Sequence, residues 1–103
     1  MDWFHVIQIL YPNHIKNRLS LRKIPYSLPQ KIYEQSGERY FDAQTGHRVA
    51  IMKVKLYNKI RDVMIAYIIE GDYVKLLTIH PLGIDQKLKR VKSGRWSKID
   101  EKV

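Results

Sequence analysis

The chain contains no cysteine, so histidine and arginine are the side chains best suited to chemistry. Cleaving RNA without a metal ion needs a base for the 2′-hydroxyl proton, cations around the phosphorane and an acid for the leaving 5′-oxygen. His80 ends an apolar run and precedes Pro81, which cannot extend a strand, so we predict it at a strand end beside a loop. A structural role for this histidine is the competing interpretation.

A second candidate group lies near the N-terminus. His14, Arg18 and Arg22 follow one another at four-residue intervals and would form one stripe of a helix. We predict His80 or His14 as the proton-transfer group, with Arg18, Arg39 and Arg95 stabilising the phosphorane. The predicted catalytic residues are therefore His80, His14, Arg18 and Arg39.

Non-catalytic, structural roles for these residues remain open. His14 at a helix start could complete a cap or a surface hydrogen bond. The Arg18/Arg22 stripe could be a solvated face or could pair with Glu34 and Glu38.

The charge of the chain indicates an anionic partner. Nineteen Lys and Arg against ten Asp and Glu give a formal net charge of +9. Neutralising phosphates and releasing their counterions is a common use of such an excess. From residue 85 onward the sequence holds seven basic residues and three acids, so we predict that this segment positions an RNA backbone. The predicted nucleic-acid-binding residues are Arg22, Lys87, Lys89, Arg90, Lys92, Arg95, Trp96 and Lys98.

Trp96 has two interpretations, a platform on which a base stacks or an anchor of the C-terminal segment in the core.

Several other classes of function lack support. No two histidines have metal-ligand spacing, no cysteine is available, and no glycine-rich nucleotide-binding or nucleophile motif occurs, so we predict neither metal nor cofactor. No apolar run approaches the roughly 20 residues that cross a bilayer, and the N-terminus does not resemble a signal peptide. We therefore expect a cytoplasmic protein without membrane contact.

The sequence pattern predicts one domain over residues 1–103. Residues 1–38 should be mainly helical, 39–81 an antiparallel sheet and 82–103 a basic extension. Residues 4–11 read as a short strand, and Asn13 is the expected N-cap of a helix over 14–22. A second helix should begin at Leu28-Pro29 and end before Ser36-Gly37. Strands are expected over 39–41, 47–57, 60–70 and 73–80, with a tight connection at Asn58-Lys59 and a short helix capped by Asp85.

These elements predict an α+β fold. N-terminal helices would pack on a four-stranded, or five-stranded, antiparallel sheet, followed by a basic C-terminal helix.

The segment over residues 11–24 resembles the H-A-x-x-R-x-x-x-R-G-I opening of small domains related to the RelE, ParE and BrnT toxins. His14 and Arg18 match this motif, whereas Lys23 stands where the family usually has glycine. The resemblance implies a RelE-like fold and a metal-independent endoribonuclease of a toxin–antitoxin system. It also implies RNA as substrate, ribosome-bound for some relatives, and an acidic antitoxin as partner.

Two other functions compete with this expectation. One is a non-catalytic nucleic-acid-binding module that uses the same basic surface. The other is a protein-directed toxin or adaptor, as ParE-type relatives act on gyrase.

Overall fold

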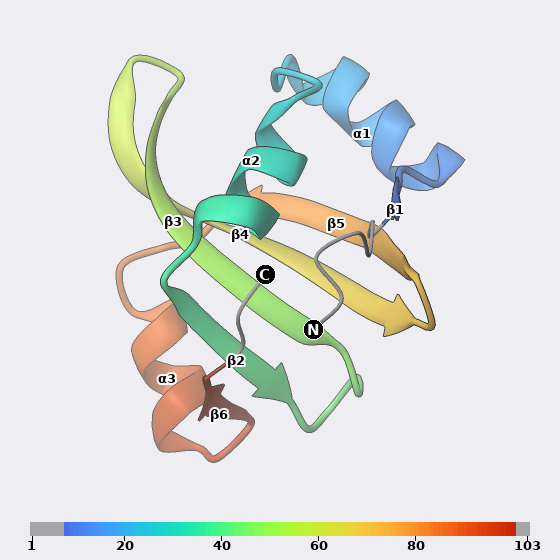
Figure 1. The fold of residues 1–103 in the computed structure, drawn as a ribbon. Coiled ribbons are helices and arrows are strands. Elements are labelled where there is room, and N and C mark those ends of the chain that lie inside the picture. Colours follow the sequence, from blue (N-terminus) through green and yellow to red (C-terminus); the bar gives the residue numbers. More distant parts are fainter. Residues whose placement is uncertain (1–7, 101–103) are drawn as a thin grey trace.

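Three helices and a six-stranded sheet make up the part of the chain, residues 8–100, that the computed structural model describes (Figure 1). In chain order the elements are β1 (Gln8–Leu10), α1 (Asn13–Arg22), α2 (Leu28–Gln35), β2 (Glu38–Asp42), β3 (Arg48–Leu56), β4 (Lys59–Glu70), β5 (Tyr73–Pro81), α3 (Gln86–Lys92) and β6 (Trp96–Ile99). The strand order across the sheet is β1-β5-β4-β3-β2-β6.

The predicted four- or five-stranded antiparallel sheet is wrong, because the sheet has six strands and is mixed. β1 runs parallel to β5 at one edge, and β6 adds antiparallel to β2 at the other. Both edge strands are short, with three and four residues, so neither produces an extended alternating pattern. Of the strand expected over residues 4–11, only β1 lies within the described part of the chain. The predicted helices and the β2–β5 meander occur close to their expected positions.

Helix α1 differs from expectation at its start, whereas it ends at Arg22 as expected. Pro12 is its N-cap and accepts the Lys16 N–H at 3.2 Å, so Asn13 is the first helical residue and does not cap with its side chain. Its C-cap is Lys23, whose φ of 54° lies in the left-handed region that favours glycine. Glycine would therefore suit the backbone at this position better than lysine does.

The sheet is covered on both faces, because its strands alternate between two apolar clusters. Helices α1 and α2 pack on the first face, which we call the helix face. Its buried cluster contains Ile15, Leu19, Ile24, Leu28, Ile32, Tyr33, Ala50, Val54, Leu56, Val63, Ile65, Tyr67, Val74, Leu76 and Ile79. The opposite face holds the smaller cluster Tyr40, Val49, Ile51, Met64, Ala66 and Trp96. Each large aliphatic side chain buried here contributes about 1.5–3 kcal/mol of hydrophobic stabilisation.

The β3–β4 hairpin extends beyond its neighbours and appears as the yellow-green loop at the upper left of Figure 1. β2 pairs with β3 only up to Ile51, and β5 pairs with β4 only from Val63 onward. Residues 52–62 therefore form a two-stranded projection, which we call the basic arm. Its turn is made by Tyr57 and Asn58, with φ of 55° and 62°, as a type I′ hairpin requires. The predicted turn at Asn58-Lys59 is displaced by one residue.

Candidate nucleic-acid interface

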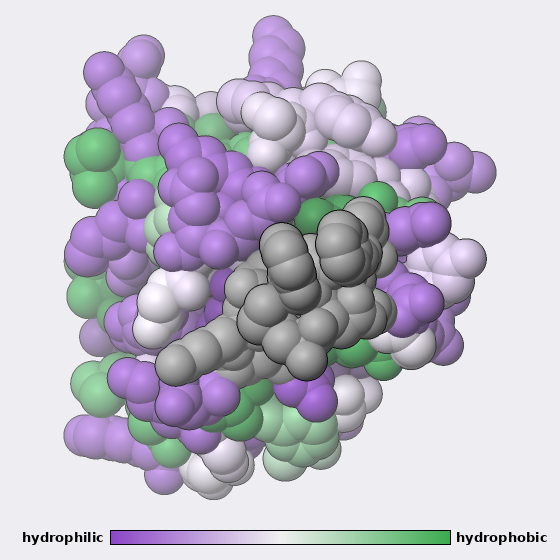
Figure 2. Space-filling model, viewed as in Figure 1, coloured by the Kyte–Doolittle hydropathy of each residue, from purple (hydrophilic) through white to green (hydrophobic). Residues whose placement is uncertain are grey.

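The basic arm carries four cations, Lys53, Lys55, Lys59 and Arg61, and one carboxylate, Asp62. Asp62 is already paired with Lys53, since the carboxylate oxygen lies 3.1 Å from Nζ. Lys55 and Lys59 are exposed, so their ammonium groups are accessible to a ligand. In Figure 2, hydrophilic residues cover most of the surface around the arm, with small hydrophobic areas along the same edge.

Contacts with helix α1 fix the tip of the arm. The Tyr57 hydroxyl donates to the backbone carbonyl of Arg22 at 2.6 Å, and Leu56 beside it is buried. The Arg61 guanidinium lies over the Tyr57 ring, 5.5 Å from its centroid, yet Tyr57 remains 47% exposed. The end of α1, with Arg22 and Lys23, therefore joins the arm in one cationic surface that includes the contact between the Arg61 guanidinium and the Tyr57 ring.

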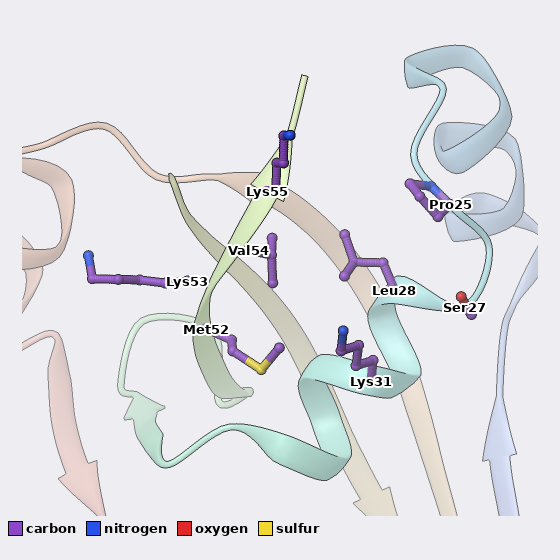
Figure 3. A pocket seen from close by; sticks show the side chains of 8 residues that line it. All are labelled: Pro25, Ser27, Leu28, Lys31, Met52, Lys53, Val54 and Lys55. Atoms are coloured by element: carbon purple, nitrogen blue, oxygen red, sulfur yellow. The ribbon is translucent and has the colours of Figure 1, made fainter. Parts of the chain in front are cut away.

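A pocket of about 430 Å³ lies beside the arm, between the start of α2 and β3 (Figure 3). Met52 and Val54 point toward α2 and form its apolar side, whereas Lys53 points away from it. Lys31 of α2 lies on the pocket wall. The pocket thus extends the cationic surface from the arm onto α2.

Three of the six predicted cations of the C-terminal segment are engaged within the fold. Lys87 donates to the Glu38 carboxylate at 2.9 Å, and Arg95 makes two bonds to the Asp42 carboxylate, at 3.0 and 2.9 Å. Arg90 lies 5.0 Å from the centroid of the Trp96 ring.

The remaining three predicted cations of this segment, Lys89, Lys92 and Lys98, are exposed.

The two carboxylates of β2 are held as anions by these contacts. Burial raises the pKa of Asp42, but hydrogen bonds from Arg95 and from the Gln44 amide outweigh it and hold this pKa well below the usual value. Burial also raises the pKa of Tyr40, and the Glu38 carboxylate that accepts from its hydroxyl at 2.6 Å adds to this, giving about 12. Burial raises the pKa of Glu38, but the hydrogen bonds from Tyr40 and Lys87 outweigh it, so this pKa is lowered. The ion pairs Lys87–Glu38 and Arg95–Asp42 hold α3 and the start of β6 against β2.

Trp96 and Arg39 are both enclosed. Trp96 is 2% exposed and stacks on Tyr40, with ring centroids 5.5 Å apart, which matches the core-anchor interpretation and leaves no free ring face for a base. Arg39 is 3% exposed on the helix face. It donates to the Tyr67 hydroxyl at 3.1 Å and to the Tyr33 carbonyl, and its guanidinium lies over both rings. A phosphate has no approach to it in this conformation.

The structure does not bring the predicted histidines together. His14 and Arg18 lie on α1, which covers the helix face. Ile79 is buried in the helix-face cluster, so its neighbour His80 faces the opposite side of the sheet, opposite Met64. The two histidines therefore cannot serve one catalytic centre in this fold.

The hydrogen bonds of the two histidines differ in a way that matters for proton transfer. Arg18 Nε donates to His14 Nε2 at 3.1 Å, so this basic nitrogen is already engaged. His80 Nδ1 lies 3.0 Å from the Pro81 carbonyl oxygen, which can only accept. Nδ1 is therefore the donor of this hydrogen bond, and in the neutral imidazole Nε2 is the nitrogen with the lone pair that can act as a base.

Our sequence analysis missed the arm cations Lys53, Lys55, Lys59 and Arg61. Their signal is present in the sequence as two basic pairs at alternate positions on either side of the Tyr57-Asn58 turn. That pattern is compatible with any solvated hairpin. It becomes informative once the structure shows that this hairpin projects beyond the sheet.

Within residues 8–100, no three or more histidine or acidic side chains gather closely enough to hold a metal ion. No helix in the same range has the length and apolar composition that crossing a membrane requires. The chain matched no known protein family, no curated protein and no solved structure.

Proposed function

We propose that this protein binds RNA, with the basic arm and the end of α1 contacting the phosphate backbone. The observation that carries this proposal is the local charge. Arg22, Lys23 and the four arm cations face a single carboxylate, Asp62, which Lys53 already neutralises. A surface that concentrates cations without counter-charges attracts polyanions and gains free energy from counterion release.

The Tyr57–Arg61 stack favours single-stranded RNA over a duplex. Bases of single-stranded segments stack on tyrosine rings and on arginine planes, and each such contact contributes about 1–3 kcal/mol. Tyr57 sits at the tip of the arm with its ring half exposed and its hydroxyl fixed to α1. Its position suits a base that is turned out of a loop or an unpaired stretch.

Fluorescence anisotropy with a labelled single-stranded RNA of roughly 12 nucleotides tests this proposal. Tyr57→Leu should weaken binding by about 5- to 100-fold, because it removes the stacking surface. Tyr73→Leu is the matched control, since Tyr73 is 45% exposed at the β4–β5 turn, away from the arm. Equal loss in the two variants, or no binding by the wild-type protein, would refute the proposal.

The tautomer of His80 favours a second, more specific candidate, a metal-independent endoribonuclease. His80 Nε2 would take the proton of a 2′-hydroxyl, whose oxygen then bonds to phosphorus while the bond to the 5′-oxygen breaks. The products are a 2′,3′-cyclic phosphate and a 5′-hydroxyl, the latter receiving a proton from an acid or from water. Of the predicted phosphorane-stabilising cations, Arg18 lies on the other face, Arg39 is buried and Arg95 is paired with Asp42.

Incubation with free RNA and with ribosome-bound mRNA in excess EDTA tests this candidate. Cyclic-phosphate products that His80→Ala abolishes and His14→Ala leaves intact would support it. RNA that stays intact while binding is normal would leave the binding function alone standing. Cleavage lost in His14→Ala instead would refute the assignment to His80.

A further inference from the structure

Helix α3 exposes its two apolar residues and turns two of its four cations, Lys87 and Arg90, inward. Leu88 and Val91 are 52% and 39% exposed, and Ile84, in the turn that precedes α3, is 99% exposed. On the other side Lys87 binds Glu38, and Arg90 lies over the Trp96 ring. A surface helix usually buries its apolar side chains, whereas α3 leaves both of its own partly exposed. We call the three exposed residues the apolar ridge.

A groove of about 340 Å³ lies between the basic arm and the loop that leads to α3. Its apolar lining includes Leu82, Ile84 of the ridge and Ile60, which is 69% exposed. Lys59 and Arg61 lie along the same groove. Its carboxylate, Asp62, is paired with Lys53.

From these features we propose that the apolar ridge and this groove bind an acidic amphipathic helix of a partner protein. Leu88 and Val91 lie one helical turn apart on α3, and Ile84 lies in the turn before it, so the three side chains can pack between the apolar side chains of a second helix. Lys89 and Lys92 flank the ridge and are exposed, as is Lys59 at the groove. Glutamates and aspartates on the edges of the partner helix would meet these lysines.

A second copy of this chain fits the surface poorly. A two-fold dimer on the ridge would place Lys89 and Lys92 opposite the same residues of the other copy, and like charges across an interface cost several kcal/mol.

An anionic membrane would meet a helix of only seven residues, and it could not follow the groove, because the groove is concave.

The RNA surface and this docking surface share Lys59 and Arg61, so the two ligands should exclude each other. That consequence rests on the proposed function, whereas the docking surface itself does not.

The docking proposal is tested with a labelled synthetic peptide of about 16 residues that is built as a helix with leucines on one face and glutamates elsewhere. A second peptide carries lysines in place of the glutamates. Anisotropy at near-physiological salt should show binding of the glutamate peptide and at least about tenfold weaker binding of the lysine peptide. Ile84→Ser/Leu88→Ser should weaken the glutamate peptide by about tenfold or more.

Leu21→Ser is the matched control, because Leu21 is 82% exposed on α1 and lies outside the groove. It should bind the glutamate peptide as the wild-type protein does. All the substituted side chains are exposed, so thermal unfolding should show that both variants fold normally. RNA binding should also persist in Ile84→Ser/Leu88→Ser, which separates failure of this proposal from failure of the RNA proposal.

Four results would overturn the docking proposal. One is that the wild-type protein does not bind the glutamate peptide, and another is that the double variant binds it equally well. A third is a dimer in sedimentation velocity that disappears in the double variant, which would assign the ridge to a second copy. The fourth is binding to phosphatidylserine vesicles, but not to the peptide, that the double variant loses.

Discussion

Neutralising two arm lysines should lower both the affinity for RNA and its dependence on salt. Lys55 and Lys59 are the cations to change, because both are exposed and neither belongs to the Lys53–Asp62 pair. Glutamine retains much of the side-chain stem while removing the charge, so Lys55→Gln/Lys59→Gln tests the charge with little change in packing.

The size of the effect follows from the number of phosphate contacts. With Lys53 neutralised by Asp62, the interface offers five cations: Arg22, Lys23, Lys55, Lys59 and Arg61. On single-stranded nucleic acid each contact adds about −0.7 to the slope of log K against log salt, which gives about −3.5 for the wild-type protein and about −2.1 for the double variant. Between about 50 and 200 mM salt the affinity should therefore fall about 130-fold for the former and about 20-fold for the latter.

Anisotropy titrations of the labelled single-stranded RNA at four or more salt concentrations measure both slopes. The control is Lys89→Gln/Lys92→Gln, which makes the same change in net charge on α3. It should leave the wild-type slope unchanged. A lowered slope in the α3 variant and an unchanged slope in the arm variant would refute the arm and restore the C-terminal segment that the sequence predicted.

Two further predictions concern stability. Because the pKa of Asp42 is held well below its usual value, its contribution is complete at neutral pH and is lost as pH falls below about 4 toward the folded-state pKa. Denaturation between about pH 6 and 2 should thus show a smaller loss of unfolding free energy for Asp42→Asn than for the wild-type protein, and equal losses would contradict the Arg95 pairing. Lys23→Gly should raise the unfolding free energy by about 1 kcal/mol, because it relieves a left-handed φ of 54°. Lys23→Ala should give no such gain in urea denaturation, and equal gains would rule out the backbone as the cause.

The helices and the central strands could be predicted because their signals are local. Pro29 in the first turn of α2 and the glycine of the β4–β5 turn mark boundaries within a few residues of the pattern they end. The edge strands could not be predicted in the same way. β1 and β6 gain their hydrogen bonds from β5 and β2, more than 50 residues away in the chain, and three or four residues show no useful period.

For the site residues, too, local relationships could be predicted from the sequence and long-range ones could not. The proximity of His14 and Arg18 followed from helical spacing, and the structure shows their hydrogen bond. Whether His80 shares a centre with them depends on which face of the sheet it occupies. That is set by the register of β5 against β4, with a bulge near Ala66, and no local pattern of residues fixes it.

Where the free positive charge lies depends on where the fold places the acids. β2 brings Glu38 and Asp42 against the C-terminal segment, so two of the cations that the sequence predicted to bind RNA, Lys87 and Arg95, are paired within the fold instead. The arm, in contrast, has one carboxylate for its four cations. The contacts of Lys87 and Arg90 also orient α3 so that its apolar residues lie in solvent. A single strand with two carboxylates therefore supports both our proposal that RNA binds at the arm and our proposal that a partner docks on the exposed ridge.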